Sequence, residues 1–333
     1  MSTTPPRIFT LSNARGLEIR LMDQGATWLS CLVPLADGSR REVLLGCRTP
    51  EDYLVQKSFL GATIGRYANR IAGSRFSLDG QEHSLTPSQG KHCLHGGPDG
   101  FDRRRWSVGE ITADSITFTL DSPAGDQGFP GQARVSALYR LEEDSVTLEY
   151  RAEVDAPCPL SLTNHAYFNL DGDGDVLGHS LRLAASRYLP VDADLIPLAA
   201  PAPVTGTSFD FLKAQTIGSR LLADEQQKIA RGYDHSFLLD EGSRTGCEAA
   251  AEVRSADTRL SMRLFTDHPA LQFYSGNYLD GTPARDGSYG RYAGLALEPG
   301  FPPDAPNRAA AEACILRPGT VYRHFIRFQF LAE

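Results

Sequence analysis

Apolar and polar residues alternate with a period of two along much of the chain. From Val146 to Val154 every second residue is apolar, and the residues between them are charged or carry a hydroxyl group. This period is typical of a β-strand with one face in the core and the other in solvent. Residues 133–141 alternate in the same way, and the polar link 142–145 between the two segments predicts an antiparallel hairpin.

Strand signal extends over most of the sequence, and helical signal is limited. The same alternation predicts further strands, namely at 116–120, 260–264 and 322–330. Helical spacing occurs at 219–230, where Ser219 is the expected N-cap, and as a single turn over 307–314. No linker, composition break or fixed-period repeat divides the chain. We therefore expect an all-β fold, a large antiparallel β-sandwich with few short helices, forming a single domain over residues 1–333.

Composition excludes several classes of protein. The chain has 333 residues, 41% of them apolar, which is ordinary globular usage and enough to bury a sizeable core. The formal net charge of −8 argues against a general nucleic-acid binder. No run of about 18 apolar residues predicts a membrane span, and no apolar secretory segment follows Met1. The six scattered cysteines include no C-x-x-C pair, so we expect buried reduced thiols and a cytoplasmic protein.

Two features suggest metal sites, and both signals are weak. Residues 171–175 read Asp-Gly-Asp-Gly-Asp, like the start of a calcium loop, but Val176 and Arg182 stand where such a loop needs Gly and a bidentate Glu. His92 and His95 could suggest zinc, yet their odd separation would point them to opposite faces of an extended segment. We therefore favour a polar turn at the first position and predict no metal at either.

Several short motifs place polar residues in apolar or Gly/Pro-rich surroundings. Taken singly, each polar residue is more often structural, as a satisfied core histidine, a capping aspartate or a buried ion pair. Glu298 is harder to explain in this way, because a carboxylate at the end of an apolar strand must be solvated, paired or shifted in pKa. The motifs are Gly65–Ile71, Leu94–Gly97, Thr163–Leu170, Tyr233–His235, Gln272–Tyr274, Leu297–Pro299 and Pro303–Asn307.

In this order and of these types, the motifs make the sequence resemble the aldose 1-epimerases (galactose mutarotases). The resemblance covers residues 61–307, most of the chain. It implies a large β-sandwich, which agrees with the alternation described above. It also implies interconversion of the α and β anomers of a free aldohexose, such as galactose or glucose. The expected partner is a small sugar, with no cofactor, metal, nucleic acid or membrane.

The resemblance also implies a role for each matching residue. Glu298 falls on the general base, which takes the proton of the anomeric hydroxyl, and His165 falls on the general acid, which protonates the ring oxygen. The positions expected to hold the sugar are Asn69, Arg70, His95, Tyr167, Asp234 and Gln272. One departure concerns the sugar preference, because Gly300 stands where family members often carry Gln.

The chemistry explains why these residue types are needed. Opening a hemiacetal requires one group to remove the C1 hydroxyl proton and another to protonate the ring oxygen, and each typically contributes about 10²–10⁴-fold. Burial should raise the pKa of Glu298. We expect His165 to be protonated at the start of a turnover, with its pKa held up by a nearby carboxylate. Activity should then follow a bell-shaped dependence on pH.

Three alternatives stay open on the sequence alone. A mutarotase for hexose 6-phosphates would need a cationic cluster, for which Arg103–Arg105 is the one dense basic run. A non-catalytic carbohydrate-binding module would have no need for both Glu298 and His165. A two-carboxylate glycosidase would need a second carboxylate partnered with Glu298, and none is evident. The preferred aldose, the metabolic pathway and the oligomeric state, monomer or homodimer, are not predicted.

Overall fold

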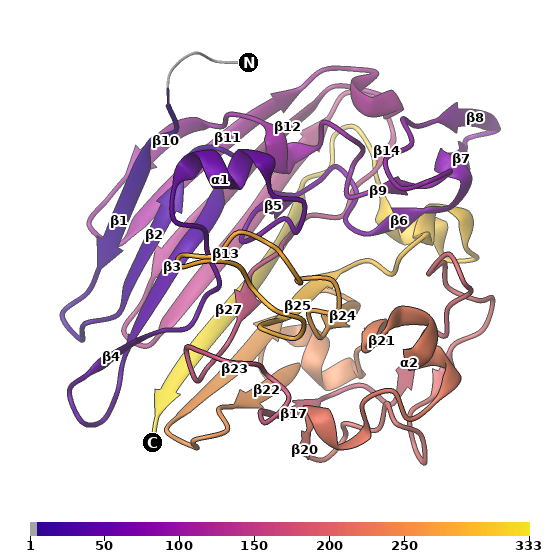
Figure 1. Cartoon of the computed structure of the whole chain (residues 1–333). Helices are drawn as coiled ribbons and strands as arrows, with labels where there is room; N and C mark the ends of the chain where they lie inside the picture. The colour runs from indigo at the N-terminus through magenta and orange to yellow at the C-terminus, as the bar shows by residue number, and fades with distance from the viewer. Residues whose placement is uncertain (1–4) are drawn as a thin grey trace.

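Antiparallel strands are the predominant regular secondary structure of the described residues (Figure 1). The structure is a computed structural model, and it describes residues 5–333. Its largest sheet has the strand order β10-β11-β12-β13-β27-β23-β22-β17-β20. These strands are β10 (Ser107–Ile111), β11 (Ser115–Ser122), β12 (Ala133–Leu141), β13 (Ser145–Val154), β27 (Tyr322–Ala332), β23 (Leu260–Thr266), β22 (Ala251–Arg254), β17 (Ser180–Leu183) and β20 (Gln215–Thr216).

Two smaller sheets complete the main layers. The six-stranded sheet contains β16 (Tyr167–Phe168), β25 (Leu295–Gly300), β24 (Ala270–Tyr274), β21 (Asp234–Leu238), β18 (Arg187–Tyr188) and β19 (Ala202–Pro203). The four-stranded sheet contains β1 (Ile8–Ser12), β2 (Glu18–Met22), β3 (Thr27–Pro34) and β4 (Arg40–Glu42). Short two-stranded ladders pair β5 (Thr63–Ile64) with β15 (Thr163–Asn164), β6 (Arg70–Ile71) with β9 (Cys93–Leu94), β7 (Arg75–Leu78) with β8 (Gln81–Ser84), and β14 (Cys158–Pro159) with β26 (Ile315–Leu316).

Aromatic side chains from all three large sheets meet in the core. Trp28 on β3 lies with its ring centroid 5.9 Å from Phe168 on β16 and 5.6 Å from Phe328 on β27. The rings of Phe168 and Phe328 are 4.9 Å apart, and all three side chains are fully buried. Because these residues join the inner faces of the sheets, the molecule is a β-sandwich, and the predicted fold class is confirmed.

The predicted hairpin is present. Residues 133–141 form β12, which pairs antiparallel with β13 from Ala133 opposite Val154 to Leu141 opposite Val146. The C-terminal strand β27, drawn in yellow in Figure 1, lies inside the large sheet between β13 and β23. The two halves of the sheet are therefore joined by a strand that comes last in the sequence.

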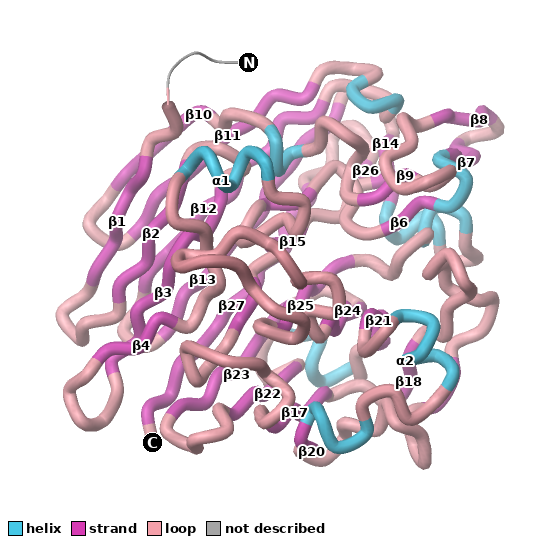
Figure 2. The backbone as a smooth tube through the Cα atoms, viewed as in Figure 1, coloured by secondary structure: helices cyan, strands magenta, loops and turns pink. Residues whose placement is uncertain are grey.

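Helices are few and short, as the tube in Figure 2 shows. The α-helices are α1 (Pro50–Val55) and α2 (Glu225–Ala230). The 3-10 turns are Ala72–Ser74, Phe101–Arg103, Asp126–Gly128, Ile217–Arg220, Glu241–Thr245, Ala305–Asn307 and Ala311–Cys314. In the described residues 5–333, no helix is long and apolar enough to cross a membrane.

The predicted helix at 219–230 was too long at its N-terminal end. Asp224 is the N-cap of α2, and its side chain accepts a hydrogen bond from Gln227 N–H. Ser219 instead lies in a 3-10 turn, where its hydroxyl donates to the carbonyl of Thr216. A serine that bonds backward to its own turn cannot cap the helix that follows. The single turn expected at 307–314 is replaced by two separate 3-10 turns.

Candidate active site

Neighbouring strands of the six-stranded sheet present polar side chains in rows on one face. Gln272 on β24 is paired with Ser236 on β21 and with Glu298 on β25. Asp234 on β21 is paired with Tyr274 on β24 in the next row. Residues opposite each other, and residues two apart along a strand, point to the same face of a sheet. The sheet therefore gathers Asp234, Gln272 and Glu298 from three distant segments of sequence.

Short segments facing this sheet supply the histidines. His165 lies between β15 and β16, and its backbone is held by hydrogen bonds from His165 N–H to Ala62 and from Gly61 N–H to His165. His95 follows β9, and Asn69 precedes β6. Asn69 N–H donates to His95 Nδ1 at 3.1 Å, and His95 N–H donates to the Asn69 carbonyl at 3.1 Å. A neutral His95 ring that accepts at Nδ1 carries its proton on Nε2, so it is a hydrogen-bond donor there.

The glycine after His95 has a steric explanation. Gly96 has a φ of +84°, and a Cβ built there would lie 2.0 Å from the carbonyl oxygen of Gly65. A side chain at Gly96 would therefore push the backbone at Gly65 away, and would displace the segment that leads from Gly65 to Asn69. The Leu94–Gly97 motif thus allows the close approach that places His95 beside Asn69.

The segment that carries Asn69 and Arg70 is anchored by Arg66. This side chain is 1% exposed, and its guanidinium donates at 2.7–2.9 Å to five acceptors. These acceptors are the hydroxyl of Ser122 and the carbonyls of Ser122, Pro123, Pro130 and Gly131. Each N–H of the planar group is used, so Arg66 is structural although it lies in a motif that marks the site.

Most of the predicted residues line one cavity of about 670 Å³. This volume lies within the range of about 300–1,000 Å³ that is usual for small-molecule sites. The predicted residues that line it are Asn69, Arg70, His95, His165, Tyr167, Asp234 and Glu298. Gln272 is not among the residues that line this cavity. Its amide donates to Asp234 Oδ1 at 2.6 Å, and it lines a small neighbouring hollow together with Glu298.

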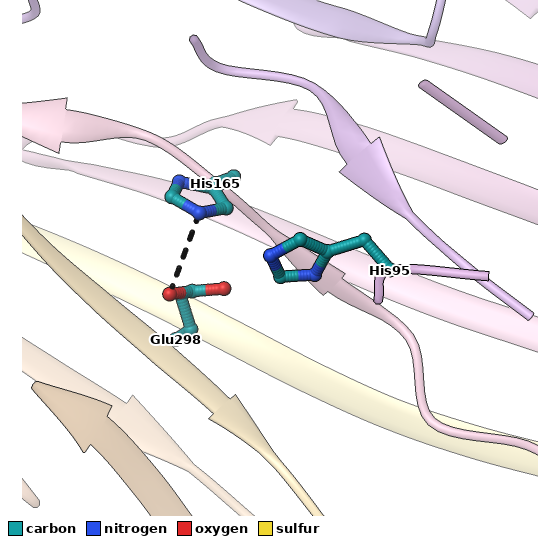
Figure 3. A group of neighbouring side chains, drawn as sticks. All are labelled: His95, His165 and Glu298. Atoms are coloured by element: carbon teal, nitrogen blue, oxygen red, sulfur yellow. Dashed lines mark ion pairs between the residues drawn. The ribbon is translucent and has the colours of Figure 1, made fainter. Parts of the chain in front are cut away.

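His165 and Glu298 form a close, buried pair. Their Nε2 and Oε1 atoms are 3.6 Å apart, and each side chain is 6% exposed. Figure 3 shows the two groups facing each other, with the ring of His95 beside both. The arrangement puts an imidazole and a carboxyl group within reach of one small molecule in the cavity, as acid–base chemistry requires.

The two pKa values are shifted in opposite directions. Burial, aided by the nearby Asp234 carboxylate, raises the pKa of Glu298 to about 8, although the Arg70 guanidinium opposes the shift. Burial lowers the pKa of His165 to about 4. The expectation that a carboxylate would hold the His165 pKa up was wrong. The reason is that burial penalises the charged imidazole, and Glu298, whose own pKa is raised to about 8, offers no compensating negative charge below that pH.

The pair therefore holds a single proton over a wide range of pH. Between about pH 4 and pH 8 the pair carries one titratable proton, and the two pKa values place it on Glu298. The two protonation steps belong to the coupled pair rather than to independent residues. A buried pair that exchanges one proton is suited to moving protons between two atoms of a bound molecule.

Arg70 and Asp234 form the polar side of the cavity. Arg70 Nη2 lies 4.0 Å from Asp234 Oδ2, and the side chains are 8% and 12% exposed. Burial raises the pKa of Asp234, whereas Arg70 and the Gln272 amide act to lower it. Arg70 Nε donates to Gln89 Oε1 at 2.7 Å. Gln89 was not predicted, and its Ser-Gln-Gly surroundings resemble an ordinary polar turn.

Aromatic rings form the apolar side. Tyr167 lies 4.9 Å from the ring of His165, and Tyr274 packs edge-on to Tyr167 at 5.9 Å. Phe59 stacks on His165 at 5.8 Å and contacts His95 edge-on at 4.6 Å. Sequence reasoning missed Phe59, which carries no polar signal, and left Tyr274 unassigned within the quoted Gln272–Tyr274 motif.

The same site contains three groups at metal-ligand spacing. The ligand atoms of His95, His165 and Glu298 all lie within 4.8 Å of one another. The hydrogen bond from Asn69 N–H to His95 Nδ1 leaves Nε2 protonated in the neutral ring, and a protonated nitrogen has no lone pair for a metal. The set therefore fits hydrogen bonding to a polar molecule better than it fits a metal ion.

Fold and site together define a class of protein: a β-sandwich with a buried histidine–glutamate pair in a cavity lined by polar and aromatic side chains. Comparison with known proteins specifies the class. The family model described as Aldose 1-epimerase matches residues 7–329. The aldose 1-epimerase of Escherichia coli is 51% identical over 334 residues, covering 99% of this chain and 96% of the relative. The galactose mutarotase of Rattus norvegicus is 37% identical over 318 residues, covering 94% and 91%.

A solved structure supports the same family assignment. The galactose 1-epimerase of Lactobacillus acidophilus superimposes with a TM-score of 0.88 at 29% identity, covering all of this chain and 96% of that one. The chain belongs to the aldose 1-epimerase family. It is an isomerase that acts on carbohydrates and interconverts the α and β anomers of an aldose. The family and activity inferred from the sequence motifs are thereby confirmed.

Proposed function

We propose that His165 and Glu298 are the acid–base pair that opens and closes the sugar ring. The observation that carries this proposal is the pair itself, with Nε2 and Oε1 3.6 Å apart and both side chains buried at the floor of the cavity. In these roles Glu298 is the general base and His165 the general acid. A free aldohexose such as galactose or glucose is the proposed substrate.

The proposed reaction moves two protons and breaks one bond. With the proton transferred from Glu298 to His165, the Glu298 carboxylate removes the proton of the C1 hydroxyl. The C1–O1 bond becomes a carbonyl as the bond between C1 and the ring oxygen breaks, and His165 protonates the departing oxygen. After rotation about the C1–C2 bond, the ring oxygen attacks the other face of C1, and both protons return. Both residues thus end each turnover as they began, and no other group is consumed.

The other cavity residues are proposed to hold the sugar. Arg70, Asn69 and His95 offer N–H donors, and Asp234 offers carboxylate acceptors, for directional hydrogen bonds to hydroxyl groups. Tyr167 is proposed to contact the apolar C–H surface of the pyranose. Gln272 supports this set through its hydrogen bond to Asp234.

The test is to measure the approach to anomeric equilibrium with freshly dissolved α-D-galactose and α-D-glucose, by polarimetry or anomer-resolved NMR. Glu298→Gln and His165→Ala should each lose about 10²–10⁴-fold of the rate while keeping the wild-type circular dichroism spectrum. Glu110→Gln, the same chemical change at an exposed position of β10, is the matched control and should stay fully active. A folded Glu298→Gln enzyme with near wild-type rate would refute the assignment.

The hexose 6-phosphate alternative loses its main support. Arg103–Arg105 line a neighbouring cavity that shares Val55 and Gln56 with the catalytic one. Carboxylates already neutralise the run, because Arg104 pairs with Asp99 and Asp126, and Arg105 pairs with Asp23. A free aldose is therefore the better substrate class, and lack of inhibition by inorganic phosphate would support it.

We also propose that the chain forms one domain and works in the cytoplasm. The domain proposal is supported by one core cluster that runs from Leu11 to Phe330. The location is supported by six free cysteines, five of them buried. A single cooperative unfolding transition and recovery of the activity in the cytosolic fraction of the source cells are the expected results.

A further inference from the structure

Gln89 makes a direct contact with the guanidinium group of the catalytic cavity. Its Oε1 accepts a hydrogen bond from Arg70 Nε at 2.7 Å, the shortest of the contacts made by this guanidinium. Arg70 Nη1 donates to Asn69 Oδ1 at 3.3 Å, and Nη2 lies 4.0 Å from Asp234 Oδ2. Gln89 is exposed at the mouth of the cavity, whereas Arg70 is buried. The contact therefore joins a surface loop to the interior of the site.

Gln89 Oε1 accepts from Nε, the guanidinium nitrogen nearest the Arg70 side-chain stem, and this position determines how the group is oriented. The Nε–H bond lies in the plane of the group, on the side nearest the side-chain stem, so a fixed acceptor there sets the orientation of the whole planar fork. A long side chain without such an anchor has several rotamers, and ordering it on binding costs conformational entropy. With Nε engaged, the two Nη groups of Arg70 are left to face Asn69, Asp234 and the cavity.

The backbone that carries Gln89 is itself held in place. Gln89 N–H donates to the His92 carbonyl and His92 N–H donates to the Gln89 carbonyl, both at 3.0 Å. The His92 ring is buried and spans two further segments: Nδ1 accepts from Gly73 N–H at 3.1 Å, and Nε2 lies 3.2 Å from Asp194 Oδ2. The loop is thus pinned on two sides, and Gln89 presents its amide oxygen from a fixed point.

We propose that Gln89 is a positioning residue of this enzyme, which holds the Arg70 guanidinium in the orientation that binds the sugar beside Asp234. The inference rests on the proposed function of Arg70 as a sugar ligand. Gln89 acts through Arg70 and does not itself contact the reacting atoms of the sugar.

This arrangement has an electrostatic consequence at the acid–base pair. The charges that act on the Glu298 carboxyl group are those of Asp234 and Arg70. The other titratable groups facing Glu298 are His165, His95, Tyr167 and Tyr274. Arg70 lowers the pKa of Glu298, against burial and Asp234. An Arg70 side chain released from Gln89 would swing away from this position, and the pKa of Glu298 would rise. The alkaline limb of the pH–rate profile would then move to higher pH.

The experiment compares Gln89→Leu, Gln89→Glu and Gln81→Leu by steady-state polarimetry with α-D-galactose. Gln89→Leu removes the acceptor and should raise KM about five- to tenfold, as expected for loss of one charge-assisted hydrogen bond, with a smaller fall in kcat. Its alkaline limb should shift upward. Gln89→Glu restores an acceptor for Arg70 Nε and should bring KM back to within about twofold of wild type.

Gln81→Leu is the matched control, because it makes the same chemical change at an exposed position of β8. It should leave KM and the pH profile unchanged. Equal KM values for Gln89→Leu and wild type, or an equal rise of KM in Gln89→Leu and Gln89→Glu, would overturn the proposal. Arg70→Met separates the two levels of inference: an unchanged KM in that variant would refute the sugar-binding role of Arg70 instead.

Discussion

If His165 and Glu298 act as the proposed acid–base pair, their shifted pKa values set the pH range over which the enzyme should work. An ordinary glutamate and histidine titrate near about 4.3 and 6.5, which would give a narrow bell-shaped profile. In this site the pair takes up a second proton near pH 4 and loses its last proton near pH 8. The form with one shared proton is the form that can open the ring. The profile of kcat/KM should therefore be broad, with limbs near pH 4 and pH 8.

The size of the effect follows from these values. Each pH unit beyond a limb lowers the active fraction about tenfold, so activity at pH 10 should be about a hundredfold below the plateau. Between about pH 5 and pH 7 the rate should change little, since both steps lie outside that interval. The alkaline limb reports loss of the proton from Glu298, because His165 is already neutral there.

The assay is polarimetry of α-D-galactose well below KM, across pH 3.5 to about 10. The spontaneous rate in each buffer is subtracted, because acid and hydroxide both catalyse mutarotation. Infrared difference spectroscopy gives an independent reading: a protonated carboxyl band should be present at pH 6, absent above about pH 9, and missing throughout in Glu298→Gln. An alkaline limb near pH 6.5, or no limb up to pH 10, would refute the proposed protonation state of the pair.

Further substitutions test the electrostatics and the scaffold. Asp234→Asn removes a negative charge that raises the pKa of Glu298, so the alkaline limb of the pH–rate profile should move to lower pH. The same substitution removes a proposed hydrogen-bond acceptor for the sugar and should raise KM. Both effects are measured in one set of rate profiles. Arg66→Lys supplies at most three donors for the five acceptors and should lower the free energy of unfolding by about 3 kcal/mol in urea titrations; a loss below about 1 kcal/mol would contradict the hydrogen-bond assignment. Gly96→Ala should reduce both stability and activity, measured by thermal unfolding and polarimetry, because its Cβ would meet Gly65.

The strands that sequence alternation predicted are those with one face in solvent. β12 and β13 lie in this class, and their bounds were predicted to within one residue. β24 and β25 are buried on both faces. Their apolar residues therefore do not alternate regularly with polar ones, and the period of two is lost. Their existence could be inferred from motifs, but their pairing, which aligns Gln272 with Glu298, could not.

The site was predicted through motifs rather than through physical patterns, and its missing parts show why. Phe59 and Gln89 lie in segments whose residues give no local sign of a cavity. His165 is covered by the rings of Phe59, His95 and Tyr167, two of which come from distant parts of the sequence. The resulting burial decides the sign of the His165 pKa shift. A short sequence window contains no such long-range information, so the chemical type of each residue was predictable and its protonation state was not.

The central place of β27 also has a consequence for biosynthesis. Strands β10 to β13 emerge from the ribosome well before residues 322–332, which pair with both β13 and β23. Until that segment leaves the exit tunnel, β13 has a long open edge of unsatisfied backbone groups, which is a template for association between nascent chains. Completion of the sheet therefore waits for the synthesis of β27, and the yield of folded enzyme should depend on how well chaperones shield that edge during the delay.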